Sequence, residues 1–540
     1  KDDENNLQRR QFLVQVQHRT EKPGRDEDWE RTRRRKCEQR TKSDGGRTVS
    51  EVRQSRVEVL YHAVEERGRR ADGVLRMREV QTHVFAEQLI LFLSSEVLLS
   101  SEVQTHVFAE ELILLFTMTM GKEEEKQQQQ QQHIPWRPRD FSSVKNHPLS
   151  GITFAQWYRL VRKYRGDIEY FRYFPRLVFL TVMSMFNALF ACVEMVCYGS
   201  AISKTIVDDD PVIIVGHPRT GTTHLHNLLT LDEDSFYTCT TFDVGFPSSF
   251  LLFPKRVREM LKTIMDDTRP MDNMRLAHDS PQEDEVATNQ LSSCLASPYA
   301  PLMFPKLEEK FRPFYRLDGE DEEYPCKLED ARIWRDNFWY FVQKVAYAAE
   351  NSRKKDDALK KKRRRLVLKS PVHMARIKLL ARMFPKAQFL VCHRHPYETF
   401  QSAANMADKY YWSCFLQAPR NREEIEEFIF RQGEILHDAY EKDLKDIDDL
   451  TPRVMEIPFK ELDEKPLQTL EKIYNKFEFK PRKEKYKGSD AETKAKAYIE
   501  SAALKNFKKN AFSADLSRAT KREINRRWRT WFRLFDYTKF

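Results

Sequence analysis

The sequence predicts an α/β fold in which a parallel β-sheet is covered by helices on both faces. From residue 211 onward, short apolar runs alternate with stretches of helical spacing. This alternation is typical of parallel strands that are joined by crossover helices. The predicted strands, in chain order, are 211–215, 365–371, 387–396 and 453–458, and helices are predicted over 372–383 and 467–477.

The first 140 residues differ in composition from the rest, and we expect most of them to be disordered. Residues 1–78 are rich in Arg, Glu, Gln and Asp with few large apolar side chains, so burial cannot offset the entropy lost on ordering. The segment 79–87 recurs as 102–110, but two copies are too few for a solenoid. Either these apolar stretches pair as helices, or the region is a duplicated or mistranslated extension. We therefore expect an extension over 1–140 and one domain over 141–540.

An apolar run of 22 residues over 177–198 is long enough to span a bilayer as a helix. Against a span, Asn187 and Glu194 lie inside the run, and such polar groups are costly in hydrocarbon. We expect a hydrophobic helix over 174–199, with three alternatives open: burial in the protein, binding along a membrane surface, or a single membrane span. Another helix is predicted just before it, over 154–174.

The chain of 540 residues has a formal net charge of +10, which suits a polyanionic ligand. Much of the positive charge lies in the N-terminal segment and in the run 360–365, and we expect no nucleic-acid partner. The 8 cysteines include no C-x-x-C pair, and the sequence has no Asn-x-Ser/Thr sequon. Both observations favour a reducing compartment, so we expect a cytoplasmic or membrane-associated protein. The oligomeric state is left open by the sequence.

A glycine-bounded turn follows the first predicted strand. Residues 216–223 are Gly-His-Pro-Arg-Thr-Gly-Thr-Thr, and a helical stretch begins at the end of this turn. Backbone N–H groups at a helix N-terminus point at an anion, so strand, turn and helix together predict a phosphate-binding loop. Gly216 and Gly221 have Walker spacing, but Thr222 stands where an NTP-hydrolysing P-loop has Lys. Arg219 supplies the positive charge from inside the loop instead.

The segment 218–223 resembles the 5′-phosphosulfate loop of the P-loop sulfotransferases, which use 3′-phosphoadenosine 5′-phosphosulfate (PAPS). The second half of the family pattern follows downstream, where Arg394 ends a predicted strand and Ser402 lies eight residues later. The segments 268–273 (Thr-Arg-Pro-Met-Asp-Asn) and 279–285 (Asp-Ser-Pro-Gln-Glu-Asp-Glu) also resemble an uncharacterised branch of this family.

The resemblance covers roughly residues 150–540 and implies a P-loop-type sheet with PAPS as the co-substrate. In the family, an Arg at the strand end and a Ser on the next helix hold the 3′-phosphate of the nucleotide, which implies this role for Arg394 and Ser402. Thr222 and Thr223 are implied to donate hydroxyls to the 5′-phosphate, or else only cap the helix. The implied donor-binding residues are Arg219, Thr220, Gly221, Thr222, Thr223, Arg394 and Ser402.

The resemblance further implies in-line transfer of a sulfuryl group to a hydroxyl acceptor. The acceptor is expected to be a small molecule, a lipid or a carbohydrate, and a membrane surface stays open as a partner. Two aromatic-rich segments, 246–253 and 410–415, either line an apolar acceptor site or belong to the core. The fold does not determine the acceptor, because variable loops build that pocket.

Sulfuryl transfer, like phosphoryl transfer, depends mainly on positioning and electrostatic stabilisation. Its leaving group is a nucleotide phosphate, so a cation at the bridging oxygen and the loop N–H groups suffice without a metal. Arg219 and Lys369 are the candidates for that charge, the alternative being that Lys369 is a plain strand-end lysine. No metal site is predicted, because His393 and His395 have no third ligand at a recognisable spacing.

The acceptor hydroxyl needs a general base, and the acidic motif 279–285 supplies clustered carboxylates near a helix start. Like charges at close range raise one pKa, which suits a base that acts near neutral pH. Glu283 is the first candidate for the base, Glu285 the second, and His278 the rival. The alternative is a solvated helix N-terminus whose acids favour the helix dipole.

Two other classes of function stay open. The first is a nucleotide-dependent kinase or GTPase-like protein, which is disfavoured by Thr222 and by the lack of a clear Walker B strand ending in Asp. The second is an inactive, membrane-associated scaffold. It is disfavoured by the intact residues Arg219, Lys369, Arg394 and Ser402.

Overall fold

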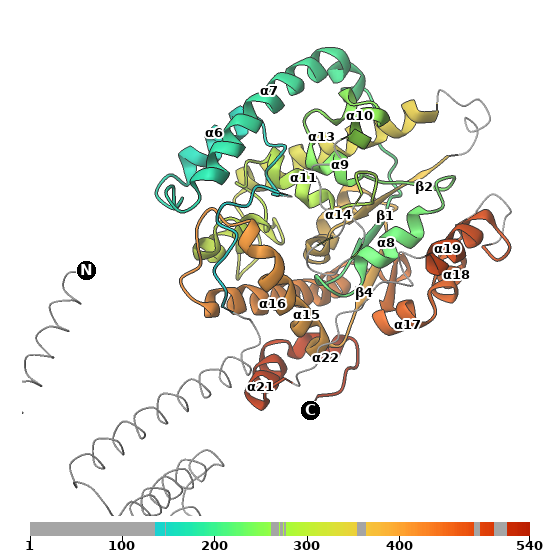
Figure 1. Ribbon diagram of the computed structural model, residues 1–540. Coiled ribbons are helices and arrows are strands. Elements are labelled where there is room, and N and C mark those ends of the chain that lie inside the picture. The colour runs from blue at the N-terminus through green and yellow to red at the C-terminus, as the bar shows by residue number, and fades with distance from the viewer. Residues whose placement is uncertain are drawn as a thin grey trace, which may run out of the picture. The chain divides into compact units, whose positions relative to one another are not determined.

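In the part of the chain that the structure describes, five parallel strands form one sheet (Figure 1). The strands are β1 (Val212–Val215), β2 (Phe236–Tyr237), β3 (Arg365–Lys369), β4 (Gln388–His393) and β5 (Val454–Pro458). Their order across the sheet is β2-β3-β1-β4-β5, and each neighbouring pair runs parallel. The predicted parallel sheet is therefore confirmed. The sequence did not predict β2, because two residues are too short to carry a pattern.

The structure is a computed structural model, and it describes residues 136–145, 147–260, 269, 274, 277–353, 363–479, 486–501 and 516–539. All of them belong to one of the two units into which the chain divides, residues 126–540. The expected disorder of the N-terminal extension and the duplication within it fall outside the described residues, apart from 136–140. The boundary at residue 140 stays a prediction.

The side chains of β1, the central strand, alternate between two hydrophobic cores. Ile213 and Val215 belong to the larger core, whereas Val212 and Ile214 belong to the smaller one. Successive side chains of a strand point to opposite faces, so a core on each side means that both faces of the sheet are covered. This burial explains why the strands are continuous apolar runs rather than alternating ones.

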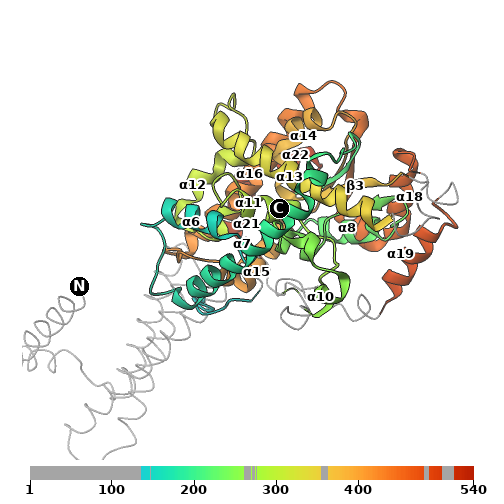
Figure 2. The ribbon, with the colours of Figure 1, turned by 90° about the horizontal axis from the view of Figure 1, so that it is seen from above.

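Two groups of helices cover the sheet, and in both views α19 lies on the opposite side from α6 (Figures 1 and 2). Helices that contribute to the larger core are α6 (Phe154–Lys163), α7 (Phe174–Ser203), α9 (Thr241–Gly245), α11 (Asp284–Leu291), α12 (Glu308–Phe311), α13 (Leu328–Arg353), α14 (Ile377–Met383), α15 (Pro396–Tyr410), α16 (Arg422–Asp446), α21 (Arg518–Arg527) and α22 (Arg529–Leu534). Those of the smaller core are α8 (Thr222–Thr230), α17 (Phe459–Glu464), α18 (Pro466–Lys476) and α19 (Asp490–Glu500). The short helix α10 (Lys255–Met260) follows α9 in the chain.

The helix predicted over 372–383 is divided in the structure. It begins as a 3₁₀-helix, Pro371–Arg376, and continues as α14. A 3₁₀ turn brings side chains at i and i+3 to the same side. His373 and Arg376 have this spacing, and both contact acidic side chains of α11. The tighter turn therefore serves the packing of this segment against α11.

The helix predicted over 154–174 is also interrupted, since α6 ends at Lys163 and α7 begins only at Phe174. Pro175 occupies the first turn of α7, where the fixed φ of proline suits a helix start. The hydrophobic helix expected over 174–199 is α7. Among the described residues it is the one helix that is long and apolar enough to cross a membrane.

The carboxyl ends of three neighbouring strands meet at one edge of the sheet. The phosphate loop follows β1 at Gly216, Ser370 follows β3, and Arg394 follows β4. In open parallel sheets this edge is where ligands bind. The order β3-β1-β4 therefore brings together segments that lie more than 150 residues apart in the chain.

Candidate active site

The loop between β1 and α8 is shaped by two glycines with positive φ. Gly216 has φ of 142°, and a Cβ added there would lie 2.2 Å from the carbonyl oxygen of Cys392 on β4. Gly221, the N-cap of α8, has φ of 93°, and a Cβ there would lie 2.5 Å from the ring of Phe459. Glycine alone meets both conditions without strain. The loop thus lies close against β4 and α17, and the first turn of α8 keeps N–H groups without intrahelical partners.

The threonines of the loop have different surroundings. Thr220 is buried and donates its hydroxyl to a backbone carbonyl of the loop at 2.8 Å. Thr222 and Thr223 line a cavity beside the loop. The hydroxyl oxygen of Thr223 lies 3.3 Å from Nζ of Lys369 and 3.3 Å from Nη1 of Arg269. Thr220 therefore holds the shape of the loop, whereas Thr222 and Thr223 face space that a ligand can occupy.

The two predicted 3′-phosphate residues have separate partners. Ser402, buried on α15, accepts a hydrogen bond of 3.1 Å from Nε of Arg219. Arg394 donates to Glu398 at 2.8 Å, and its guanidinium lies 4.5 Å from the centre of the Phe459 ring. That ring also packs against the phosphate loop. Both predicted residues are therefore linked to the loop, one through an arginine and one through an aromatic ring.

Lys369 and Glu283 form an ion pair at the carboxyl end of β3. Nζ of Lys369 lies 2.8 Å from Oε1 of Glu283, and the lysine side chain has no solvent exposure. Burial lowers the pKa of Lys369, although the charge of Glu283 opposes that change. Burial would raise the pKa of Glu283, but the ammonium of Lys369 and hydrogen bonds from Lys369 and Tyr299 hold that pKa below its ordinary value. Glu283 is therefore an ionised carboxylate at neutral pH.

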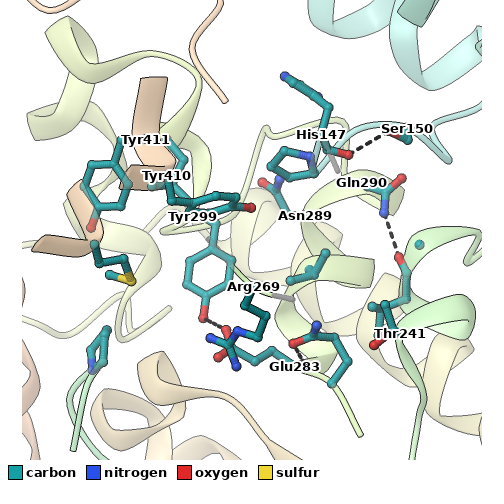
Figure 3. Close-up of a pocket in the computed structure, with 18 of the residues that line it drawn as sticks. His147, Ser150, Thr241, Arg269, Glu283, Asn289, Gln290, Tyr299, Tyr410 and Tyr411 are labelled. Atoms are coloured by element: carbon teal, nitrogen blue, oxygen red, sulfur yellow. Dashed lines mark hydrogen bonds between the residues drawn. The ribbon is translucent and has the colours of Figure 1, made fainter. Parts of the chain in front are cut away.

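Tyr299 belongs to this group, and the sequence analysis missed it. Its hydroxyl donates to Oε2 of Glu283 at 2.5 Å and lies 3.3 Å from the hydroxyl of Ser370. Burial and the Glu283 carboxylate raise the pKa of Tyr299 well above its ordinary value, so the phenol stays protonated. Figure 3 shows its ring directed toward Glu283, with Arg269 beside them. Arg269 lies in a segment that carried the family resemblance, whereas no motif marks Tyr299.

The last three carboxylates of the acidic motif pair with three residues at the end of β3 and in the segment that follows it. The pairs are Glu283 with Lys369 at 2.8 Å, Asp284 with His373 at 2.6 Å, and Glu285 with Arg376 at 2.7 Å. The expectation that neighbouring like charges raise the pKa of the base was wrong for Glu283, because Lys369 and Tyr299 stabilise its ionised form and its two neighbours pair with other side chains. The motif does begin a helix, α11, and Glu283, Asp284 and Glu285 are paired inside the protein, whereas Asp279 is exposed.

The other two candidates for the base have different positions. Glu285 is fully buried, and it also accepts hydrogen bonds from Trp334 at 3.0 Å and from Ser297 at 2.7 Å. The backbone carbonyl of His278 accepts a hydrogen bond from Phe242 at 2.9 Å, and its Nδ1 is buried without a hydrogen-bond partner. Glu283 lines the cavity, and neither Glu285 nor His278 is part of that lining. The general base stays a prediction, and position favours Glu283.

The cavity has a volume of about 470 Å³. Its polar wall, next to the phosphate loop, includes Arg219, Thr223, Arg269 and Glu283. Much of the remaining lining is apolar or aromatic and comes from α7, α9 and the end of α15. These lining residues include Phe179, Met183, Phe242, Phe246, Tyr410 and Tyr411.

The two aromatic-rich segments divide between the cavity and the core. Phe246, Tyr410 and Tyr411 line the cavity, in agreement with the acceptor-site alternative. Others of the same segments are buried elsewhere in the larger core: Phe250, Trp412 and Phe415. In the described part of the chain, no group of three or more His, Cys, Asp or Glu side chains is arranged to hold a metal ion.

Comparison with known proteins identifies the family. A family model described as "Sulfotransferase family" matches residues 211–481. The chain is 30% identical over 269 residues to omega-hydroxy-beta-dihydromenaquinone-9 sulfotransferase Stf3 of Mycobacterium bovis and of Mycobacterium tuberculosis. That match covers 50% of this chain and 63% of each relative, so the chain spans less than two thirds of their length.

Two solved structures are similar at low identity. Sulfotransferase STF1 of Mycobacterium tuberculosis is 16% identical with a TM-score of 0.47, and the match covers 70% of this chain and 93% of that one. Sulfotransferase STF9 of Mycobacterium avium is 16% identical with a TM-score of 0.42, covering 65% and 83%. The family match over residues 211–481 includes the phosphate loop and both halves of the predicted site. This match shows that the chain belongs to the sulfotransferase family.

Proposed function

We propose that this protein is a PAPS-dependent sulfotransferase that moves a sulfuryl group to the hydroxyl of an acceptor. One observation carries the proposal: the phosphate loop and an ionised carboxylate line one cavity, and a buried lysine contacts both of them. Thr223 of the loop lies 3.3 Å from Lys369, and Lys369 lies 2.8 Å from Glu283. This arrangement supports a mechanism in which the loop binds the phosphosulfate and the neighbouring carboxylate accepts a proton.

The donor side offers charges that suit PAPS. The loop N–H groups, Arg219 and Lys369 would bind the 5′-phosphosulfate, and Arg269, which lines the cavity, adds a third cation near Thr223. Ser402 and Arg394 would hold the 3′-phosphate, which distinguishes this nucleotide from ATP and GTP. Ser402 is already held by Arg219 at 3.1 Å, so binding at one residue would position the other.

The transfer step then requires one proton acceptor and one cation. Glu283 takes the proton of the acceptor hydroxyl while the new oxygen–sulfur bond forms and the bond between sulfur and the phosphate oxygen breaks. Lys369 offsets the negative charge that grows on the leaving phosphate. Tyr299 keeps Glu283 in place through its hydrogen bond of 2.5 Å. Because the pKa of Glu283 is lowered, the base is ionised before the acceptor arrives.

The acceptor is proposed to be an apolar or aromatic molecule with a hydroxyl group. The cavity lining outside the polar wall is mostly apolar or aromatic, which favours such a molecule or a lipid over a carbohydrate. The name of the mycobacterial relatives gives omega-hydroxy-beta-dihydromenaquinone-9 as the acceptor of those proteins. It supports a hydroxylated lipid as the first acceptor class to test here.

Calorimetric titration tests the donor. Adenosine 3′,5′-bisphosphate should bind at least about tenfold tighter than ATP or GTP, because the 3′-phosphate adds charge-assisted hydrogen bonds. Transfer of radiolabelled sulfate from PAPS to a panel of alcohols and phenols should survive EDTA. Preferential binding of ATP or GTP, with activity that Mg²⁺ restores, would instead support the kinase-like alternative, which Thr222 at the Walker lysine position already disfavours.

A further inference from the structure

The helix α7 buries its charged residues and exposes large apolar ones, which is the reverse of an ordinary surface helix. Its two charged residues, Arg176 and Glu194, are both buried. The exposed side carries large apolar residues along almost its whole length, among them Phe186 at 54%, Leu189 at 61% and Val196 at 87% exposure. From Phe174 to Val196 this apolar side extends over about 33 Å at 1.5 Å per residue. A continuous apolar surface of this kind marks a binding face rather than a scatter of single exposed side chains.

The buried side of α7 is held to the protein by polar contacts. Arg176 donates to the backbone carbonyl of Ser143 at 2.9 Å. The side-chain amide of Asn187 donates to the carbonyls of Ser150 and Ile152 at 2.8 and 3.1 Å. A helix that crossed a membrane by itself would have to break these bonds. The contacts therefore favour a helix that lies along a surface.

Glu194 adds a second anchor farther along α7. It accepts a hydrogen bond from the backbone N–H of Leu251 at 2.7 Å and forms a buried ion pair with Lys344 of α13. Losing that contact would leave two unpaired charges in an apolar environment, which is strongly unfavourable. In the sequence, Asn187 and Glu194 argued against a membrane span because polar groups are costly in hydrocarbon. In the structure, both residues hold α7 against the rest of the protein.

The neighbouring helix gives this apolar side a cationic and aromatic border. Phe154 and Tyr158 on α6 are exposed, and Arg162 shares their face at i+4 from Tyr158. The exposed basic residues of this border are Arg159, Arg162, Lys163, Arg165 and Arg172. The two acids of the same stretch, Asp167 and Glu169, are half-buried. A border of cations and aromatic rings around an apolar helix suits anionic lipid headgroups above an acyl layer.

One flank of α7 connects this side to the acceptor cavity. Phe179 and Met183 line the cavity. Phe186 and Phe190 follow at i+7 and i+11 from Phe179, so all four lie on the same flank of the helix. Phe186 and Phe190 are exposed. The apolar lining of the cavity is therefore continuous along α7 with the exposed apolar side.

We propose that α6 and the exposed side of α7 dock this protein on the surface of an anionic lipid bilayer, so that the acceptor cavity opens toward the membrane. The cationic border favours a bilayer, because anionic lipid headgroups attract it. Neither an apolar protein partner nor a second copy of the chain would need such a border. The docking proposal does not depend on the proposed function. The idea that a lipid acceptor enters the cavity from the membrane rests on the proposed function.

Flotation of the full chain with phosphatidylcholine–phosphatidylserine vesicles tests the docking. The wild type should float with the vesicles, and Leu189→Glu should reduce the bound fraction by roughly tenfold or more, since a leucine that would enter the acyl layer is replaced by a charge. Leu328→Glu is the matched control, because Leu328 is 85% exposed at the start of α13, and it should float like the wild type. Absence of the wild type from the vesicle fraction, or an equal loss in both variants, overturns the proposal.

Two further measurements identify other occupants and separate the two proposals. If light scattering shows a wild-type dimer that Leu189→Glu dissociates while flotation is unchanged, a second copy covers this face and the bilayer proposal fails. In a transfer assay, Leu189→Glu should lose activity toward a long-chain alcohol embedded in vesicles but keep it toward a short-chain alcohol in solution. If no alcohol is sulfated by the wild type, the proposed function fails, while the flotation result still decides the docking.

Discussion

The polar wall of the cavity and its α7 wall are built in opposite ways. At the polar wall, Arg219, Arg269 and Glu283 are charged, and each lies within hydrogen-bonding distance of another residue of the site. At the α7 wall, Phe179 and Met183 are apolar, and the charges of that helix are turned inward toward the protein. In the proposed reaction, charge is thus concentrated at the wall where the sulfuryl group would be transferred. The α7 wall of the cavity is apolar and suits an apolar acceptor. One substitution at the polar wall, two outside it and one pH profile test this division.

The largest effect is expected from Glu283→Gln. The amide keeps the shape of the side chain but cannot accept the proton, so turnover should fall about 10²–10⁴-fold. Affinity for adenosine 3′,5′-bisphosphate should change little, because in the proposed function the carboxylate contacts the acceptor and not the nucleotide. Steady-state kinetics and calorimetry on the same preparation measure both. His278→Ala is the comparison: if it abolishes turnover while Glu283→Gln stays within a few-fold of the wild type, the histidine is the base.

Glu285→Gln should act on stability instead. Glu285 is fully buried against Arg376, and removing one partner of a buried ion pair typically destabilises by about 3–5 kcal/mol. Urea denaturation followed by fluorescence measures this change. Glu309→Gln, on an exposed residue, should stay within about 0.5 kcal/mol. If the Glu285→Gln variant were stable but inactive, Glu285 rather than Glu283 would be the general base, and the assignment of that role to Glu283 would be wrong.

Arg394→Ala tests the nucleotide specificity of the donor side. Affinity for adenosine 3′,5′-bisphosphate should fall about 10–100-fold, the range for a hydrogen bond to a charged group. Affinity for an analogue without the 3′-phosphate should be nearly unchanged. Arg420→Ala is a matched control, because Arg420 makes the same i,i+4 contact with a glutamate at an exposed site. Equal losses for both nucleotides would remove Arg394 from the 3′-phosphate site.

The smallest effect is expected from pH in the weakly acidic range. The pKa of Glu283 lies below its ordinary value of 4.5, so the acid limb of kcat/KM should lie below that value and activity should be level down to about pH 5. By linkage, this carboxylate stabilises the folded protein above its unfolded pKa, and that contribution is lost as pH falls through the lower folded value. An acid limb near neutral pH would indicate a base with a raised pKa and thus a different residue.

The sequence was most informative where function depends on short contiguous segments. The phosphate loop, the strand ends at Lys369 and Arg394, and the acidic motif could all be located because each is a local pattern of residue types. The run of apolar residues in α7 was equally visible, but not the side on which it would be exposed. Exposure depends on which backbone carbonyls and charges the rest of the chain brings to Arg176, Asn187 and Glu194.

By itself, the sequence determined the parallel α/β architecture, the position of the glycine-bounded loop and the family, because short apolar runs, glycine spacing and helix starts are encoded by neighbouring residues. Only the tertiary structure decided that Glu283 is held ionised by Lys369 and Tyr299, and that Glu285 is a buried partner of Arg376. A pKa depends on burial and on charges within a few ångströms. Those neighbours come from segments that the sheet order brings together, and no local pattern records them.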